Sequence, residues 1–166
     1  MICLNNIKEI GIISDTHIPT RASGLPEKIK EYFKNVDFII HCGDIVKEEV
    51  ILELNLITKT YAIIGNMDSV ELNYPSELIF KINNNFIICA THGYGSPFGI
   101  KERLFKKFIE IKPSIILFGH THSPLNEKYN GITFFNPGSA TCGIDVNSIG
   151  IIKLFNSEIM SETFII

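Results

Sequence analysis

The chain has 166 residues, of which 45% are hydrophobic and 20% charged, and its formal net charge at pH 7 is -3. This length and composition predict a single globular domain over residues 1–166, with enough apolar side chains for a substantial core. The net charge gives no general attraction to nucleic acid or to an anionic membrane, so neither is expected as a bulk partner. An anionic substrate would therefore have to be bound by a local site.

The four cysteines are scattered along the chain without a Cys-x-x-Cys pair, at Cys3, Cys42, Cys89 and Cys142. Most stand beside apolar residues, which predicts buried free thiols in a reducing compartment and no disulfide. The N-terminus lacks a secretory-type segment, and no apolar run approaches the ~18 residues of a membrane span. We therefore expect a cytoplasmic protein.

The first half of the chain alternates short apolar runs with helical segments. The spacing predicts a strand over 8–14, a helix from Pro26 to about Asn35, a strand over 37–41, a helix over 47–55 and a strand over 61–64. Pro19 and Gly24 indicate a loop before the first helix. Repeated strand–helix–strand units of this kind predict parallel strands.

The second half of the chain is richer in hairpins. Strands are predicted over 79–82, 86–90, 115–119, 132–136, 149–155 and about 159–165, with a turn at Asn156-Ser157 and a helix over 97–110. Pro113 ends that helix. The change from strand–helix units to hairpins predicts an α/β fold in which two mixed sheets pack together and helices flank them.

Histidine, acidic and amide residues follow the ends of the apolar runs. His120 and His122 follow the run that ends at Gly119, and Asp15 and His17 follow the first strand. If the backbone stays extended, residues i and i+2 project from the same side, so each pair is expected to face one site. Two loop histidines alone would not establish a metal site. Four histidines placed after strand ends favour one, because ligands bind beyond the carboxyl ends of strands in open α/β sheets.

Five motifs resemble, in the same order, those of the calcineurin-like metallophosphoesterases. They are Ser14-Asp15-Thr16-His17, Gly43-Asp44, Gly65-Asn66-Met67-Asp68, Thr91-His92-Gly93 and Gly119-His120-Thr121-His122. The short chain and the loop Asn136-Pro137-Gly138-Ser139 resemble the small YfcE-type phosphodiesterases. The resemblance implies a four-layer sandwich of two mixed β-sheets between outer helices.

The same resemblance implies two divalent metal ions. One would be held by Asp15, His17, Asp44 and His122, and the other by Asp44, Asn66, His92 and His120, with Asp44 as the bridge. Nitrogen and oxygen ligands suit manganese, iron, nickel, cobalt or zinc without selecting sharply among them. Manganese is the ion that the resemblance suggests. Asp44, Asn66 and His92 would act in catalysis by positioning the metals and a bridging hydroxide, which would attack the phosphorus of a small phosphodiester in line.

Met67 departs from the wider superfamily, whose phosphomonoesterases commonly have histidine after the Gly-Asn pair. That histidine resembles a general acid for the leaving group, and methionine cannot donate a proton. Loss of a positioned acid typically costs about 10²- to 10⁴-fold on a poor leaving group and little on a good one. The sequence therefore predicts a preference for activated diesters.

Further candidates have roles that the sequence leaves open. Arg21 either binds a phosphate or is solvated, and Asp68 either orients a ligand or turns the chain. His41 is interpreted as structural or as a support for the ligands, and Cys42 as a core residue. The segment 94–98 is a candidate wall of the pocket, with no contact identified.

The alternative to an enzyme is a non-catalytic scaffold or interaction module. The retromer subunit of this fold is similar to the same family and serves as a scaffold, so the fold alone does not establish catalysis. Here every expected ligand position is filled, which favours the enzyme. Association into a homo-oligomer is left open.

Overall fold

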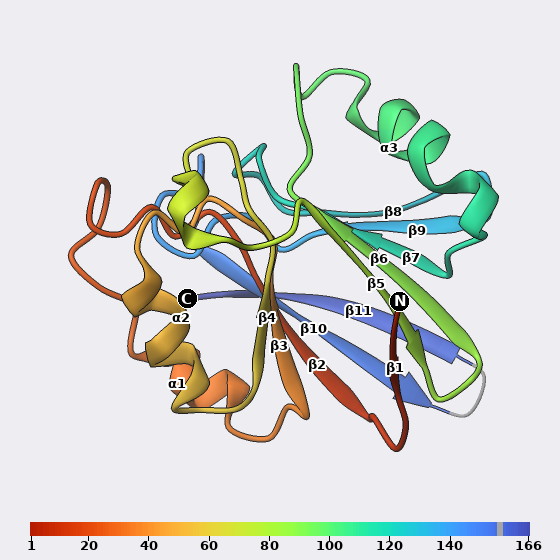
Figure 1. Ribbon diagram of the computed structural model, residues 1–166, viewed down its shortest axis with the longest axis horizontal. Helices are drawn as coiled ribbons and strands as arrows, with labels where there is room; N and C mark the ends of the chain where they lie inside the picture. The colour runs from red at the N-terminus through yellow and green to blue at the C-terminus, as the bar shows by residue number, and fades with distance from the viewer. Residues whose placement is uncertain (156–157) are drawn as a thin grey trace.

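The computed structural model describes residues 1–155 and 158–166, so the predicted turn at Asn156-Ser157 lies outside the described residues. Two β-sheets form the centre of the molecule (Figure 1). One has the order β1 (Ile2–Leu4), β5 (Glu77–Ile82), β6 (Phe86–Thr91), β7 (Ile115–Leu117), β9 (Ile132–Asn136) and β8 (Leu125–Tyr129). The other has the order β11 (Glu158–Ile165), β10 (Ser148–Phe155), β2 (Glu9–Ile13), β3 (Phe38–His41) and β4 (Thr60–Ala62).

Both sheets are mixed, as predicted. The neighbours β2, β3 and β4 are parallel, and so are β6, β7 and β9, whereas β5–β6, β8–β9 and β10–β11 are antiparallel. Parallel neighbours bring their carboxyl ends to the same edge of a sheet. The loops that follow β2, β3 and β4 therefore emerge together, and so do those that follow β6 and β7.

The helices complete four layers, which confirms the predicted architecture (Figure 1). α1 (Lys28–Phe33) and α2 (Glu48–Asn55) pack on the five-stranded sheet, where Phe33, Leu54 and Ile39 belong to one buried cluster. α3 (Ile100–Phe108) packs on the six-stranded sheet, where Leu104 meets Ile116. Two 3₁₀ helices, η1 (Val70–Leu72) and η2 (Ile109–Ile111), lie in the connections. Among the described residues, none of the helices has the length and apolar character needed to cross a membrane.

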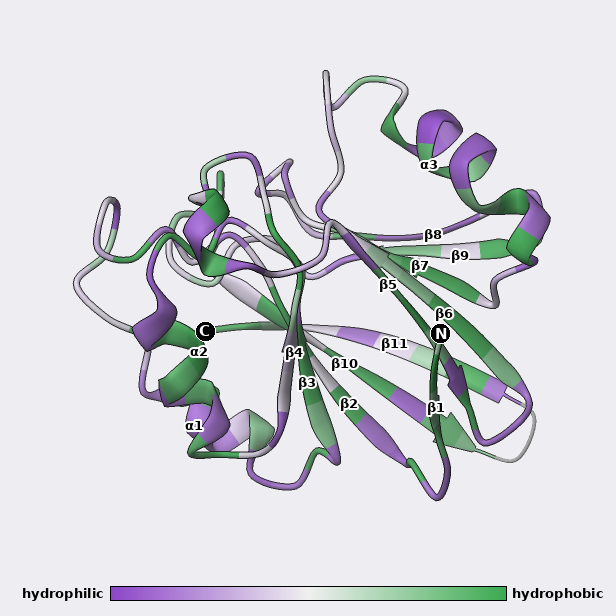
Figure 2. Cartoon of the chain, in the orientation of Figure 1, coloured by the Kyte–Doolittle hydropathy of each residue, from purple (hydrophilic) through white to green (hydrophobic). Residues whose placement is uncertain are grey.

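The main core lies between the two sheets. Phe38 of β3 and Phe80 of β5 face each other across it, with ring centroids 5.7 Å apart, and both are almost fully buried. Figure 2 colours much of β3 and β10 hydrophobic and most of α3 hydrophilic. Burial of each such large side chain contributes roughly 1.5–3 kcal/mol, so the core fixes the sheets firmly beneath the loops.

The predicted elements differ from the structure mainly at edges and ends. β1 and β8 were not predicted, because β1 has three residues and β8 is largely polar and exposed at the sheet edge, so neither has a clear apolar period. The predicted helix over 97–110 begins only at Ile100, since Gly99 has a left-handed φ of 74°. The strand predicted over 115–119 ends at Leu117, where the chain turns into the histidine loop.

Candidate metal centre

Hydrogen bonds between loop backbones join the strand ends that carry the five motifs. Asp15 N–H donates to the Gly43 carbonyl and His17 N–H to the Asp44 carbonyl, both at 3.0 Å. Gly119 N–H donates to the His92 carbonyl, also at 3.0 Å. These bonds link loops that are distant in sequence, so the predicted convergence of the strand ends is confirmed.

The expected extended geometry of the paired residues is wrong. Positive φ values occur at Asp15 (52°), His17 (44°), Asp44 (55°), His120 (70°) and His122 (57°). A left-handed conformation costs a non-glycine residue roughly 1–2 kcal/mol, and the surrounding loop–loop bonds hold it in place. The chain therefore turns sharply after each strand. Asp15 and His17 still reach the same part of the cluster, as expected, whereas His120 and His122 reach different parts.

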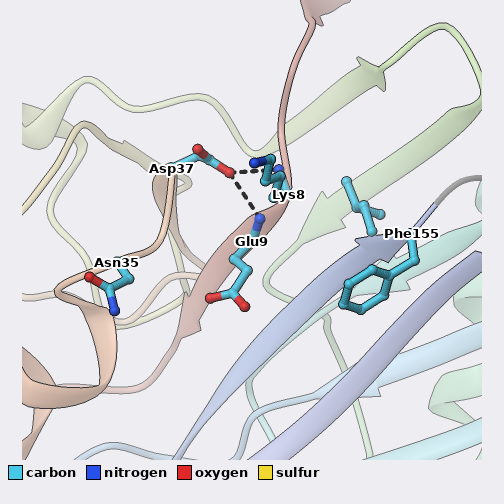
Figure 3. A pocket seen from close by; sticks show the side chains of 6 residues that line it. Lys8, Glu9, Asn35, Asp37 and Phe155 are labelled. Atoms are coloured by element: carbon cyan, nitrogen blue, oxygen red, sulfur yellow. Dashed lines mark hydrogen bonds between the residues drawn. The ribbon is translucent and has the colours of Figure 1, made fainter.

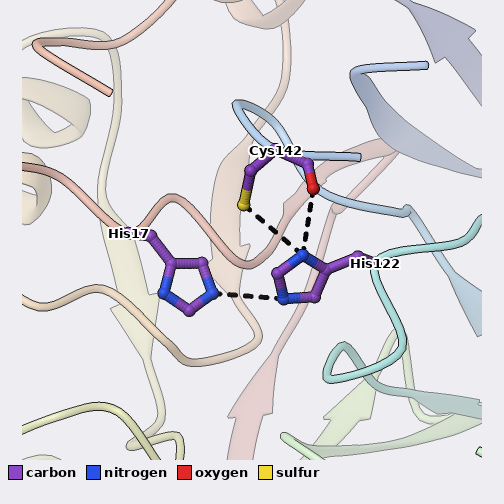
Figure 4. A group of neighbouring side chains, drawn as sticks. All are labelled: His17, His122 and Cys142. Carbon is purple, nitrogen blue, oxygen red and sulfur yellow. Dashed lines mark hydrogen bonds between the residues drawn. The ribbon is translucent and has the colours of Figure 1, made fainter. Parts of the chain in front are cut away.

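Four side chains form the first part of the cluster: Asp15, His17, Asp44 and His122. One donor atom from each lies within 4.8 Å of all the others. The His17 Nε2 atom is 3.1 Å from His122 Nε2 (Figure 4). It is also 3.4 Å from Asp44 Oδ2, and His122 Nε2 is 3.3 Å from Asp15 Oδ1. Asp15, His17 and Asp44 are almost fully buried.

The second part of the cluster is built around the side-chain oxygen of Asn66. Asn66 Oδ1 lies 3.2 Å from His92 Nε2 and 3.0 Å from His120 Nδ1. His92 Nε2 is also 3.4 Å from Asp44 Oδ2, the same oxygen that approaches His17. Asp44 thus lies between the two parts, and its other oxygen accepts the Met67 N–H at 2.8 Å.

Backbone carbonyls fix the orientation of three of these imidazoles. His92 Nδ1 faces the Cys42 carbonyl at 2.8 Å, His122 Nδ1 faces the Cys142 carbonyl at 3.0 Å, and His120 Nε2 faces the Gly95 carbonyl at 2.7 Å. A carbonyl oxygen only accepts, so the nitrogen that faces it carries the hydrogen, and in a neutral ring the other nitrogen is bare.

The arrangement of donors fits a metal cation. When the rings are neutral, His92 Nε2 and His120 Nδ1 each direct a lone pair at Asn66 Oδ1, itself an electron-pair donor, and a cation would satisfy all three. Among the described residues, His17 Nδ1 is a buried side-chain nitrogen without a hydrogen-bond partner, so the His17 ring is held less completely than the others.

The carboxylates of the cluster attract positive charge, although burial leaves the pKa of His17 below its ordinary value despite the charges of Asp44 and Asp15. The hydrogen bond and the charge of Asp15 raise the pKa of His122 to about 9, although burial opposes this. Burial tends to lower the pKa of His92, yet its hydrogen bond to Asp44 and the nearby carboxylates leave that pKa above the ordinary value. The pKa of Asp44 is below its ordinary value: burial tends to raise it, but the interactions with His92 outweigh burial. Ionised carboxylates that attract a proton to these rings also attract a metal ion.

Two glycines of the motifs lie so close to neighbouring side chains that no larger residue fits in their place. A Cβ on Gly65 would overlap Asp44 Oδ1, and a Cβ on Gly119 would overlap Ser14 Oγ. Ser14 Oγ itself donates to Asp15 Oδ2 at 2.6 Å, and the His120 N–H donates to the same oxygen at 3.0 Å. The glycines therefore make room for the buried carboxylates and for the bonds that orient them.

The further candidates take supporting places around the cluster. Asp68 accepts from the Gly65 N–H at 2.7 Å and from the Val46 N–H at 2.6 Å, so it turns its own loop and ties it to the Asp44 loop. His41 is fully buried and bonds to Thr16, in agreement with a supporting role.

Cys42 is a fully buried core residue, as expected. Arg21 is exposed, and its backbone N–H donates to the His17 carbonyl.

Cys142 is a neighbour of the cluster that sequence reasoning missed. Its Sγ lies 3.4 Å from His122 Nδ1 and 3.3 Å from Ser139 Oγ, at the position drawn in Figure 4. The expectation of buried thiols fails here and at exposed Cys3, because a neighbouring apolar residue does not show which way the chain turns. The four cysteines are free.

The cavities of the molecule include one beside the cluster and a larger one away from it. A cavity of about 220 Å³ adjoins Asn66 and His92 and is also lined by Tyr94, so the 94–98 segment does form part of a wall. A cavity of about 540 Å³ lies at the opposite end of β2, around Lys8 and Asp37 (Figure 3). There the Asp37 carboxylate accepts hydrogen bonds from the backbone N–H groups of Lys8 and Glu9, so it holds the start of β2 in place.

Comparison with known proteins agrees with the geometry. Residues 9–154 match the family model described as a calcineurin-like phosphoesterase superfamily domain. A protein of Methanocaldococcus jannaschii named as a probable metallophosphoesterase is 41% identical over 135 residues, covering 80% of this chain and 68% of that protein. Another protein of this organism, named as a phosphodiesterase, is 32% identical over 170 residues, covering 90% of this chain and 95% of that protein.

The fold also has a solved neighbour of another kind. The crystal structure of Vps29 from Chaetomium thermophilum matches with a TM-score of 0.80 and covers 95% of this chain and 97% of that one. Its sequence is 18% identical to this chain, so the likeness concerns the fold alone.

Proposed function

Because the chain belongs to the calcineurin-like phosphoesterase superfamily, we propose that its central cluster is the active site of a metal-dependent phosphodiesterase. The family predicted from the five motifs is confirmed by this membership. The substrate in this proposal is a small phosphodiester, in agreement with the name of the relative that is 32% identical.

The observation that carries the proposal is the meeting of bare donor atoms around Asn66. Asn66 Oδ1 lies 3.2 Å from His92 Nε2 and 3.0 Å from His120 Nδ1, and in the neutral rings both nitrogens present a lone pair toward it. We assign them to one divalent ion together with Asp44. The other ion is assigned to Asp15, His17, Asp44 and His122, whose donor atoms lie within 4.8 Å of one another.

The donor set suits manganese, which is the ion we propose for both positions. When bound, two divalent ions neutralise phosphoryl oxygens and activate water as a nucleophile for in-line attack. The chain itself contributes the spacing, because Asp44 is held between the two donor groups by the Met67 N–H and by the contacts with His17 and His92. Burial of Asp15, His17 and Asp44 limits water around the reacting group and so strengthens the local field.

The chain has no side-chain acid at the position after Asn66. Met67 is 54% exposed, and its thioether has no proton to give. Departure of the leaving group therefore depends on its own acidity or on water. This supports aryl and other activated diesters as the preferred substrates over alkyl monoesters.

The alternative is a non-catalytic scaffold, with which the fold likeness to Vps29 is compatible. The test is hydrolysis of bis(4-nitrophenyl) phosphate by chelator-stripped protein before and after addition of Mn²⁺. We expect turnover only with metal. Protein that binds Mn²⁺ with native-like affinity and does not hydrolyse any of a panel of phosphodiesters would favour the scaffold.

The single domain over residues 1–166 and the cytoplasmic location stay predictions, and association into a homo-oligomer stays open. The first of them can be checked by limited proteolysis. A chain that is cut into two stable fragments at an internal site would contradict it.

A further inference from the structure

The loop between β6 and α3 is wrapped around one guanidinium group. Arg103 donates from Nη2 to the Tyr94 carbonyl at 2.8 Å, from Nε to the same carbonyl at 3.2 Å and from Nη1 to the Phe98 carbonyl at 3.0 Å. Nη2 also donates to the Ser96 carbonyl. The guanidinium carbon lies 5.6 Å from the centroid of the Tyr94 ring. A single side chain thus bonds three carbonyls of one short loop.

The loop conformation matches this wrapping. Gly95 and Gly99 have left-handed φ values of 76° and 74°. A Cβ on Gly95 would lie 3.5 Å from Arg103 Nη2, and a Cβ on Gly99 would lie 3.4 Å from Nη1. Both turns therefore bring the backbone close to the guanidinium in a conformation that glycine adopts without strain.

Arg103 is itself held by the core. It stands in α3 next to Leu104, which is fully buried, and one turn or so from Ile100 and Phe108, which are almost fully buried. These three side chains pack on the outer face of the six-stranded sheet. Hydrophobic packing therefore fixes the helix from which the Arg103 side chain extends, and the bonds to the loop carbonyls hold the guanidinium itself.

The carbonyl at the centre of this loop faces a proposed metal ligand. Gly95 O accepts from His120 Nε2 at 2.7 Å, and His120 Nδ1 is then bare and directed at Asn66 Oδ1, 3.0 Å away. His120 is half-buried, and its ring meets His92 edge to face with centroids 5.3 Å apart. Among the described residues, the Gly95 carbonyl is the hydrogen-bond partner of Nε2 and so sets which nitrogen of His120 is presented to the site.

We propose that Arg103 is a positioning residue for His120. By clamping the 94–98 segment, it holds the Gly95 carbonyl where it fixes His120 with its hydrogen on Nε2 and its Nδ1 lone pair toward Asn66. The proposal rests on the proposed function for its metal: the ion that it affects is the one assigned to Asp44, Asn66, His92 and His120. Groups that orient a metal-binding histidine typically change metal affinity or activity by 10- to 100-fold when they are removed.

The test compares Arg103→Met and Arg103→Lys with Lys106→Met. Arg103→Met removes the donors and keeps much of the stem, whereas Arg103→Lys keeps the charge and lacks the planar fork. Lys106 is exposed on the same helix, so Lys106→Met is a control that also removes one positive charge. His120→Ala serves as the reference for loss of the ligand itself.

Two measurements are made. In metal-free protein, ¹⁵N–¹H correlation spectra of the histidine rings report the tautomer of His120 without any dependence on metal. Calorimetric titration with Mn²⁺ then gives the affinity of each ion. For both Arg103 variants we expect a mixture of His120 tautomers and a 10- to 100-fold weaker affinity for one ion, the ion that His120→Ala also weakens. Lys106→Met should match the unmodified protein in both measurements.

The result that overturns the proposal is a His120 ring that stays in the Nε2–H form in both Arg103 variants. Equal weakening of both ions would also overturn it, because that result indicates a general structural role. If the unmodified protein binds no Mn²⁺, the proposed function fails, while the tautomer measurement still decides the role of Arg103.

Discussion

Asp44 stands where the two parts of the cluster meet, and one of its oxygens approaches both. Asp44 Oδ2 lies 3.4 Å from His17 Nε2 and 3.4 Å from His92 Nε2. We predict that Asp44→Asn weakens both ions and reduces diester hydrolysis by at least 100-fold, because a neutral amide bridges two cations poorly. The fold should persist, since the core is built by the apolar strands. Elemental analysis and urea unfolding of the purified variant measure the two effects.

A matched control is Asp37→Asn, which makes the same change at the opposite end of β2. It should keep the metal content of the unmodified protein. Two ions per chain in Asp44→Asn would contradict the bridging role.

Met67 is the residue whose chemistry sets substrate preference. With no side-chain acid there, hydrolysis rates across a series of aryl phosphodiesters should fall steeply as the pKa of the leaving group rises. Met67→His should flatten this dependence and help poor leaving groups most, by up to about 10²- to 10⁴-fold, provided that the imidazole reaches the leaving oxygen. The measurement is the slope of log kcat/KM against leaving-group pKa for both proteins. A shallow slope in the unmodified enzyme would show that another group already supplies the proton.

At the scale of the element, β3 ends in a histidine that supports two motif loops. His41 Nδ1 accepts from the Gly43 N–H at 3.2 Å, so Nε2 carries the hydrogen that it shares with Thr16 Oγ1 at 3.0 Å. The ring is fully buried, and burial lowers its pKa from 6.5 to about 3 despite the opposing charge of Asp15. The folded protein therefore keeps His41 neutral.

This burial predicts a pH-dependent stability. His41 is protonated below about pH 6.5 in the unfolded chain and only near pH 3 in the folded chain. The unfolded state therefore gains a proton first, so the free energy of unfolding is unaffected by His41 above pH 6.5 and decreases as the pH falls toward 3. The loss should be on the order of 1.4 kcal/mol per pH unit within that range. His41→Gln removes the titration and keeps a donor and an acceptor. Urea unfolding in chelator from pH 7 to 4 should give a shallower pH slope for the variant, and identical slopes would refute the prediction.

At the scale of the whole molecule, a metal centre would join loops from both sheets. Asp15 and Asp44 follow strands of the five-stranded sheet, whereas His92, His120 and His122 follow strands of the other. Ions bound among them would link the two sheets at one end of the interface between them. Metal binding is then a contribution to the stability of the fold as well as to chemistry.

We predict that chelation lowers the stability of the unmodified protein. At free Mn²⁺ equal to 100 times Kd, one bound ion adds about 2.7 kcal/mol to the free energy of unfolding. For a chain of this length that corresponds to a rise in Tm of roughly 5–11 °C. Thermal unfolding in excess Mn²⁺ and in chelator measures the difference. Asp44→Asn should show little of it, and an equal metal effect on the variant would contradict the assignment.

The sequence by itself determined most of the strands, the two packed sheets with flanking helices and, through the resemblance of its motifs, the members of the cluster. Apolar runs such as 37–41 and 132–136 bury the same residues whatever the details of the turns, because the hydrophobic effect depends on composition and period. The five motifs contain the residues that the loops bring together, because each motif follows the end of a strand and these ends meet at one side of the molecule. Polar or very short strands, β8 and β1, escaped prediction because neither carries an apolar period.

Only the tertiary structure decided the orientation of the site residues. His120 and His122 were expected to face one site from an extended backbone, yet left-handed turns direct them to different donor groups. The carbonyls of Gly95, Cys42 and Cys142 select the nitrogen that each ring presents, and these partners lie 20 to 50 residues away from the rings that they hold. Such contacts form between loops that meet only after the sheets have packed, so no local pattern in the sequence encodes them.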